Sequence, residues 1–279
     1  MGNIVWMASY PKSGNTWVRA FLHNYIADSE TPSDINNLGD FFANESNASW
    51  YKPLVDNDLQ QLDRKTICQL RAKVQQNIAA SRRGTIMVKT HNFLGAYEDV
   101  PLHDMSITSG AISVVRNPLD VVLSLADHFG LDTDQAIEFM GSDNTGTPTD
   151  DNNVASVLAS WSTHVESWTR DQSGATCVLR YEDLLDEPHT HFAKLTQFLG
   201  LPDDPKRLDR AIEHSSFSKL KNFEEQSGFV ERSPNSSRFF RAGRKNQWSE
   251  TLEPTQVQRL VDDHREIMSR FDYIPPANR

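Results

Sequence analysis

One loop near the N-terminus combines the residue types and the spacing that bind a phosphate group. An apolar run over residues 4–8 is predicted to form a buried strand, and residues 15–27 are predicted to form the helix that follows it. Between them, Gly14 allows the backbone to approach a ligand closely, and Lys12 adds a mobile positive charge. The unsatisfied N–H groups and the dipole at the start of such a helix attract an anion. Further hydrogen-bond donors stand in the same segment: Ser13, Asn15 and Thr16.

The order of the loop residues limits the choice of phosphate chemistry. A Walker A loop carries its lysine directly after the last glycine, whereas Lys12 precedes Gly14 here. The third predicted strand is followed by Arg116 rather than ending in the aspartate of a Walker B motif. A kinase that uses Mg²⁺ and ATP is therefore less favoured. Taken alone, the segment also fits an ordinary helix N-cap beside an exposed lysine.

Charged and aromatic side chains stand at the ends of the other predicted strands. They are Lys89 and His91 at the end of residues 85–89, Arg116 after residues 111–115, and Tyr181 after residues 176–179. Ligands of parallel sheets bind beyond the carboxyl ends of the strands. We therefore expect these side chains to contribute to one site.

The predicted strands alternate with predicted helices, which indicates an α/β fold. Each strand is short, apolar and rich in β-branched residues, as parallel strands covered on both faces are. Strands separated by helices form βαβ units. We expect a single domain over residues 1–279, with a central parallel sheet flanked by helices and a P-loop-like phosphate-binding loop after the first strand. Further helices are predicted over residues 58–81, 118–129 and 154–168, in two or three segments up to residue 221, and from residue 254 onward.

The composition favours a soluble, globular, intracellular protein. The net charge of −10 disfavours general binding to nucleic acid, although cations can still converge locally. The cysteines Cys68 and Cys177 lie far apart without metal-ligand spacing, so no metal site is predicted and a reducing compartment fits. The sequence shows neither a signal peptide nor an apolar run of about 18 residues. We expect a cytoplasmic protein without a membrane partner.

The segment Tyr10-Pro11-Lys12-Ser13-Gly14-Asn15-Thr16-Trp17 closely resembles a known loop. It is the loop that binds the 5′-phosphosulfate in sulfotransferases that use 3′-phosphoadenosine-5′-phosphosulfate (PAPS). The common form has threonine where Asn15 stands, and asparagine keeps a hydrogen-bond donor there. The resemblance extends along nearly the whole chain and implies sulfuryl transfer from PAPS, which leaves as 3′-phosphoadenosine-5′-phosphate (PAP). It implies that these loop residues bind the donor: Lys12, Ser13, Gly14, Asn15, Thr16 and Trp17.

Further segments resemble other parts of the same donor site. Arg116, with Ser124 beyond it, resembles the family's 3′-phosphate site, where an arginine holds the phosphate bidentately. Tyr181 resembles the tyrosine that contacts the adenine. Ser215 and Phe217 resemble the adenine-flanking segment, in which the serine bonds the base and the phenylalanine stacks on it.

The late loop matches the family only in part. Arg241 and Gly243 match residues that close over the 3′-phosphate, but Ala242 stands where the family has lysine. The resemblance assigns all three positions to the donor site. Whether Arg244 and Lys245 replace the missing charge stays open at the level of sequence.

The likeness also implies how the chemical step is catalysed. Sulfuryl transfer moves a small electrophile in line between two oxygens, so it needs positioning, a base and positive charge on the leaving group. The resemblance implies that His91 takes the acceptor proton, that Lys12 stabilises the bridging oxygen, and that Lys89 helps on the sulfuryl side. This scheme requires no metal. Two alternatives stay open: a small-molecule or nucleotide kinase that uses Mg-ATP, and a non-catalytic protein that binds PAPS or PAP.

The acceptor is predicted only as a class. We expect a small molecule with a hydroxyl or an amine, because the resemblance implies transfer to such groups. Acceptor pockets of this family are built from variable loops, which correspond here to residues 28–53, 142–153 and 222–237. The sequence carries no recognisable signature of an oligomeric state.

Overall fold

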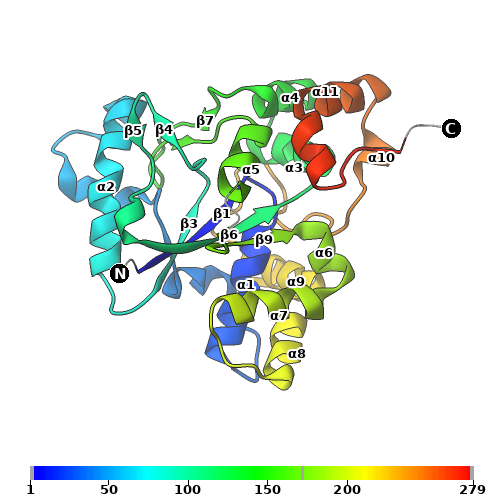
Figure 1. Ribbon diagram of the computed structural model, residues 1–279, viewed down its shortest axis with the longest axis horizontal. Coiled ribbons are helices and arrows are strands. Elements are labelled where there is room, and N and C mark those ends of the chain that lie inside the picture. Colours follow the sequence, from blue (N-terminus) through cyan, green and yellow to red (C-terminus); the bar gives the residue numbers. More distant parts are fainter. Residues whose placement is uncertain (1–2, 171–172, 277–279) are drawn as a thin grey trace. The chain divides into compact units, whose positions relative to one another are not determined.

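The central element of the fold is a five-stranded sheet with the strand order β2-β3-β1-β6-β9 (Figure 1). A computed structural model describes residues 3–170 and 173–276 of the chain. The strands of this sheet are β1 (Ile4–Ser9), β2 (Phe42–Asn44), β3 (Ile86–Thr90), β6 (Thr108–Val115) and β9 (Thr176–Arg180). The short hairpins β4 (Ala96–Tyr97) with β5 (Val100–Pro101) and β7 (Gly146–Thr147) with β8 (Ser156–Val157) complete the described strands. The predicted α/β fold with a central parallel sheet flanked by helices is confirmed.

The pairing of β1 and β3 fixes the direction and the register of these two strands. The two strands are parallel, with Met7 opposite Lys89 and Ala8 opposite Thr90. β2 lies parallel on the other side of β3. β1 is buried over its whole length, and its residues before Ser9 are all apolar. Because both strands run in the same direction, their carboxyl ends lie at one edge of the sheet.

Helices occupy most of the chain between the strands. They are α1 (Asn15–Ala27), α2 (Arg64–Ala80), α3 (Pro118–Phe129), α4 (Thr133–Gly141), α5 (Trp161–Thr169), α6 (Tyr181–Asp186), α7 (Pro188–Phe198), α8 (Pro205–His214), α9 (Phe217–Ser227), α10 (Trp248–Thr251) and α11 (Pro254–Arg270). The predicted bounds of α1 and α3 and the predicted start of α11 are confirmed. Within residues 3–170 and 173–276, no helix has both the length and the apolar character needed to cross a bilayer.

Several predicted bounds are wrong, and three of them have clear local reasons. The helix expected over residues 58–81 begins only at Arg64, because Asp63 caps it by accepting a hydrogen bond from the Thr66 N–H at 2.7 Å. The helix expected over residues 154–168 begins at Trp161, since Ser156–Val157 forms β8 and Ser160 is the N-cap. The loop expected over residues 222–237 begins later, because α9 continues to Ser227.

Contacts divide the chain into two compact units. Unit 1 lies within Met1–Tyr10, Phe41–Ser113 and Phe139–Val178, and unit 2 within Pro11–Asp40, Val114–Glu138 and Leu179–Arg279. β6 and β9 each begin in unit 1 and end in unit 2. That residues 1–279 form one sulfotransferase-type domain stays a prediction.

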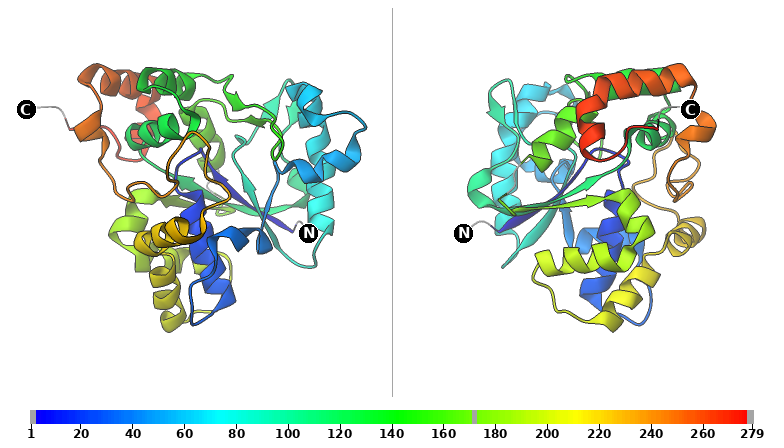
Figure 2. Two further views of the ribbon diagram at one scale, coloured as in Figure 1. Left: turned by 180° about the vertical axis from the view of Figure 1, so that it is seen from behind. Right: turned by 45° about the vertical axis from the view of Figure 1, so that its right-hand side comes forward.

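Each unit has its own packing. In unit 1, the core around β1 and β3 includes Trp6, Val88, Ile67 and Val74, all without solvent exposure. In unit 2, α1 packs against α8, and α8 packs against α7 (Figure 1). Figure 2 shows α11 beside α3 in the same unit. Helix α1, which follows the loop after β1, therefore packs against a helix from much later in the chain.

Candidate active site

The loop between β1 and α1 has a backbone conformation that few residues adopt. Gly14, the N-cap of α1, has φ 108° and ψ 10°, in the left-handed region. A Cβ atom at this position would lie 2.7 Å from Cδ2 of Tyr181, closer than two carbon atoms pack. Lys12 also has a positive φ of 68°, which is uncommon for a residue with a side chain. The fold thus requires glycine at position 14 and keeps a strained backbone at position 12.

The polar side chains of this loop include the Lys12 ammonium and the Ser13 hydroxyl. The Lys12 ammonium lies 3.8 Å from the centroid of the Phe239 ring, a cation–π contact. The Ser13 hydroxyl is buried and has no hydrogen-bond partner among residues 3–170 and 173–276. A buried hydroxyl without a partner is unfavourable unless a ligand supplies one. The loop residues therefore fit a phosphate or sulfate group.

Arg19, a residue not expected from the motif, holds the side chains at the start of α1. Its Nε donates to Asn15 Oδ1 at 2.8 Å, and its Nη2 donates to Thr16 Oγ1 at 3.0 Å. The same Nη2 lies 2.7 Å from the Glu231 carboxylate. Arg19 is only 3% exposed, so these contacts are formed away from bulk water.

Arg116 lies against the phosphate loop. Its guanidinium is 4.3 Å from the centroid of the Tyr181 ring, and its Nη1 donates to the Lys12 carbonyl at 3.3 Å. Its Nε is buried and has no hydrogen-bond partner in the described part of the chain. Burial raises the pKa of Tyr181, although the charge of Arg116 opposes that shift. The Trp17 and Tyr181 rings lie edge to face with centroids 5.4 Å apart. Residues from three chain segments thus meet around Gly14.

The predicted adenine segment and the late loop meet at Phe217. A Cβ on Gly243, which has φ 60°, would overlap ring atoms of Phe217, so glycine allows this backbone to pass over the ring. The Phe217 and Phe240 rings are edge to face, with centroids 6.3 Å apart.

Ser215 is fully buried at the end of α8, and its hydroxyl donates to the Ala211 carbonyl at 2.8 Å. Its oxygen can then act toward a ligand only as an acceptor.

The remaining predicted donor-site residues also belong to unit 2. Ser124 is the seventh residue of α3, and Arg241 is exposed while Ala242 is half-buried.

Arg244 pairs with Glu250 at 2.9 Å, and Lys245 pairs with Asp186. Both cations proposed as substitutes for the missing lysine therefore have carboxylate partners.

His91 and Lys89 belong to unit 1, at the end of β3. The His91 Nδ1 lies 2.8 Å from the Ser9 carbonyl oxygen. A carbonyl only accepts hydrogen bonds, so Nδ1 carries the proton and the lone pair of the neutral ring is on Nε2. Lys89 is the fourth residue of β3, and His91 directly follows the last residue of that strand, Thr90.

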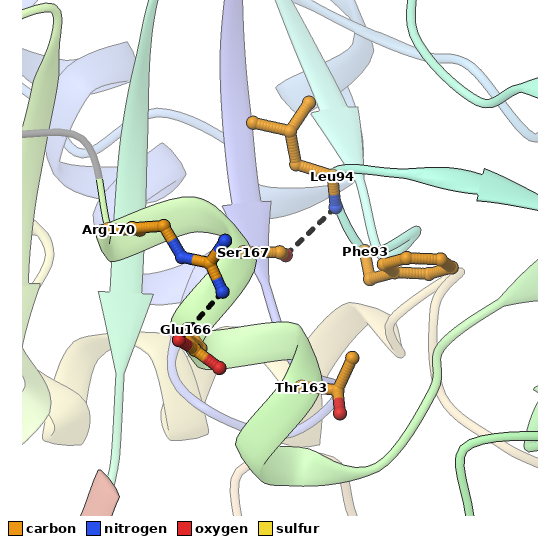
Figure 3. Close-up of a pocket in the computed structure, with 6 residues that line it drawn as sticks. All are labelled: Phe93, Leu94, Thr163, Glu166, Ser167 and Arg170. Atoms are coloured by element: carbon orange, nitrogen blue, oxygen red, sulfur yellow. Dashed lines mark hydrogen bonds and ion pairs between the residues drawn. The ribbon is translucent and has the colours of Figure 1, made fainter.

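Helix α5 of unit 1 supports the chain segment that contains His91. Ser167 Oγ accepts from the Leu94 N–H at 2.9 Å, and Trp168 Nε1 donates to the Asn92 carbonyl at 2.9 Å. Figure 3 shows Ser167 and Leu94 in the wall of a cavity of about 240 Å³, which Phe93, Thr163, Glu166 and Arg170 also line. No predicted site residue lines this cavity. His164, also on α5, forms a hydrogen bond with the His91 backbone, and burial lowers its pKa to about 3.

Three residues around the phosphate loop were missed at the level of sequence: Arg19, Glu231 and Phe239. Arg19 follows Asn15 by four positions and Thr16 by three, which is the spacing of side chains that meet on a helix. That signal was present in the sequence. Glu231 and Phe239 come from a segment more than 200 residues later, and no local pattern marks their contacts.

Comparison with known proteins gives a consistent match over most of the chain. The family model described as sulfotransferase domain matches residues 3–272. Sulfotransferase 1A1 of Canis lupus familiaris is 23% identical over 273 residues, which cover 94% of this chain and 82% of that protein. Flavonol 3-sulfotransferase of Flaveria bidentis is also 23% identical over 273 residues, covering 92% of this chain and 79% of that protein.

Solved structures show the same fold. Mouse sulfotransferase SULT7A1, described as complexed with PAP, matches with a TM-score of 0.63 and 20% identity over 97% of this chain and 85% of that chain. Retinol dehydratase, described in a complex with retinol and PAP, matches with a TM-score of 0.66 and 19% identity over 99% of this chain and 84% of that chain. At these identities, the likeness shows that the fold is shared.

Proposed function

Because the chain belongs to the sulfotransferase family, we propose that it transfers a sulfuryl group from PAPS to a hydroxyl or an amine of a small-molecule acceptor. PAP is the other product. The observation that carries the proposal is the packing of Gly14 against Tyr181 with Arg116 beside them. This arrangement joins the phosphate loop to the expected 3′-phosphate and adenine residues.

Chemical complementarity supports PAPS as the donor. The 5′-phosphosulfate would bind to Lys12, Ser13, Gly14, Asn15 and Thr16 with the start of α1, where N–H groups and the helix dipole favour an anion. Arg116 and Ser124 would bind the 3′-phosphate, with Arg241, Ala242 and Gly243 closing over it. Trp17, Tyr181, Ser215 and Phe217 would surround the adenine. Relatives described with PAP support the same nucleotide for this chain.

In the proposed reaction, the acceptor atom forms a bond to sulfur while the bond between sulfur and the bridging oxygen breaks. The electron pair of the broken bond goes to PAP, and Lys12 stabilises the charge there. His91 accepts the acceptor's proton through Nε2, the atom that carries the lone pair when Nδ1 donates to Ser9. Lys89 would act on the sulfuryl oxygens. The scheme uses no metal ion, and the enzyme would act in the cytoplasm.

Calorimetric titration with PAP, with ATP as the comparison ligand, tests the donor site. We expect PAP to bind in the micromolar range or tighter without Mg²⁺, and ATP to bind much more weakly. Stronger binding of ATP that depends on Mg²⁺ would instead favour the kinase alternative. A screen of phenols, alcohols and amines with labelled PAPS would then identify the acceptor class.

His91→Ala tests the catalytic step separately from binding. Loss of a positioned base lowers turnover by roughly 10²–10⁴-fold, while the affinity for PAP should stay within about twofold. His189→Ala is the control, because that side chain is 63% exposed. Normal turnover of His91→Ala would contradict the base assignment. PAP binding without turnover of any acceptor by the unsubstituted protein would favour the non-catalytic alternative.

A further inference from the structure

Arg19 makes contacts that no resemblance to a motif predicts. It projects from the first turns of α1 and is 3% exposed. Its guanidinium bonds to Asn15 Oδ1 at 2.8 Å, to Thr16 Oγ1 at 3.0 Å and to Glu231 Oε2 at 2.7 Å. All of these residues lie in unit 2. Two of the partners, Asn15 and Thr16, are proposed ligands of the donor's 5′-phosphosulfate.

The direction of these hydrogen bonds decides what Asn15 and Thr16 can offer to a ligand. A guanidinium has only donors, so the atoms that face Arg19 must be acceptors. Asn15 therefore turns its carbonyl oxygen toward Arg19, and its amide NH₂ points away from Arg19. The Thr16 oxygen accepts from Arg19, so its own proton is directed to another acceptor. Both residues are thereby fixed as donors, which is what a phosphate or sulfate oxygen requires.

Glu231 explains how a buried arginine can be held beside these groups. The carboxylate, 27% exposed at its side chain, neutralises the Arg19 charge at 2.7 Å. The Thr16 hydroxyl is also 3.4 Å from the same carboxylate oxygen, at the outer limit of a hydrogen bond. A phosphate oxygen at normal distance would be a better acceptor for that proton. Because Glu231 neutralises its charge, Arg19 can assist ligand binding by orienting Asn15 and Thr16 rather than by attracting the anion itself.

We propose that Arg19 is a positioning residue that orients Asn15 and Thr16 as donors to the 5′-phosphosulfate, with Glu231 as its counter-charge. The inference rests on the proposed function, because it assumes a donor with a 5′-phosphate or 5′-phosphosulfate. It also accounts for asparagine at position 15, where the common loop has threonine. The longer amide reaches Arg19 with its oxygen and still keeps a donor group.

The test compares two ligands that differ only in the 5′-phosphate, PAP and adenosine 3′-phosphate. Their affinities are measured by calorimetry, or by competition where binding is weak, for the unsubstituted protein, Glu231→Gln and the double variant Arg19→Met with Glu231→Gln. The double variant removes one positive and one negative charge, so the net charge is unchanged. Loss of oriented hydrogen bonds to a charged group should weaken PAP binding to the double variant by roughly 10- to 100-fold relative to the unsubstituted protein, which has the same net charge. The affinity for adenosine 3′-phosphate should change by less than about twofold.

Equal weakening for both ligands, or no weakening for either, would overturn the inference while leaving the proposed function intact. Failure of the unsubstituted protein to bind PAP would instead overturn the proposed function. If the double variant does not fold, Arg19→Lys replaces it. Lysine keeps the charge but cannot reach Asn15, Thr16 and Glu231 with the same fork of donors, so the same selective loss of PAP affinity is expected.

Discussion

Two arginine–glutamate pairs, one in each unit, share the same chemistry but differ in their surroundings. In unit 1, Arg71 and Glu45 lie 3.4 Å apart and have no solvent exposure. In unit 2, Arg19 and Glu231 lie 2.7 Å apart, and the Glu231 side chain is 27% exposed. The first pair is sealed inside a core, whereas the second lies beside a loop expected to bind an anion.

The surroundings of Glu45 satisfy both of its oxygens from within the protein. Oε1 accepts from Thr90 and Asn92, and Oε2 accepts from Gln75 at 3.1 Å. Burial alone would raise the pKa of this carboxyl, but Arg71, His103 and the donors on Thr90 and Asn92 hold it below its usual value. Thr90 and Asn92 flank His91 in the chain. This network therefore fixes the backbone on both sides of the proposed base.

The comparison shows that an ion pair can serve either the fold or the ligand. Around Glu45, every hydrogen bond is directed at the protein, so the pair is expected to act on stability. Around Arg19, the bonds orient groups whose other side can meet a ligand, so the pair is expected to act on binding. The predictions below separate these two roles, starting with the largest expected effect.

Arg71→Met should lower the free energy of unfolding by about 3–5 kcal/mol, because it leaves the Glu45 carboxylate buried without its counter-charge. Urea denaturation at neutral pH measures this change. Arg170→Met is the control in the same unit, since the Arg170 side chain is 75% exposed and its pair with Glu166 is a surface pair. That loss should stay below about 1 kcal/mol. Equal losses for the two variants would remove the distinction between a sealed and an open pair.

Unit 1 should also respond to acid through the histidine next to its network. Burial lowers the pKa of His103 to about 4; the nearby Glu45 opposes this shift, and Arg71 adds to it. The unfolded chain binds a proton there below about pH 6.5, whereas the folded chain does not, so stability is fully present above that pH and is lost as pH falls toward 4. The slope is about 1.4 kcal/mol per pH unit for each such histidine.

His103→Phe tests this slope, because phenylalanine keeps a ring between Trp6 and Trp168, whose centroids lie 4.6 and 4.9 Å from that of His103. Between about pH 6.5 and 5, the variant should lose about 2 kcal/mol less stability than the unsubstituted protein. His189→Phe, at an exposed position, should leave the slope unchanged. A slope unaffected by His103→Phe would show that this histidine does not contribute to acid sensitivity.

The regular elements could be predicted from sequence because each has a complete local pattern. β1 is apolar up to Ser9, α1 begins after its Gly14 N-cap, and α3 begins at Pro118 with its Asn117 cap. The prediction of a helix was wrong over residues 154–160, because the buried residues there fit helical spacing and a short buried strand equally well. β2 has only three residues within a polar stretch, so its pairing with β3 has no signal of its own.

The candidate site likewise has residues that could be predicted from the sequence and residues that could not. The loop from Lys12 to Trp17 is contiguous, so its residue types and order carry the prediction. Arg19 was readable from its helical spacing to Asn15 and Thr16. Glu231 and Phe239 reach the loop only through the tertiary fold, and their contacts with Arg19 and Lys12 leave no trace in the local sequence.

Alanine substitutions at two glycines separate the cost of backbone strain from the loss of ligand binding. Gly14 in unit 2 and Gly84 in unit 1 both have left-handed φ values, 108° and 82°. A Cβ on Gly84 meets nothing within 4 Å, whereas one on Gly14 meets Tyr181. Gly84→Ala should lower the free energy of unfolding by about 1–2 kcal/mol, the strain of an L-residue in this region. Gly14→Ala should lower it by more, because its Cβ also meets the Tyr181 ring.

Only Gly14→Ala should also weaken PAP binding, by about tenfold or more, since moving Tyr181 by even an ångström shifts the ring against which Arg116 packs. Calorimetry with PAP on both variants, beside their urea denaturation curves, makes the comparison. If Gly84→Ala weakens PAP binding as much as Gly14→Ala does, the loss follows from stability rather than from the loop. Selective loss in Gly14→Ala would show that unit 2 uses this strained turn for the ligand, as it is proposed to use Arg19.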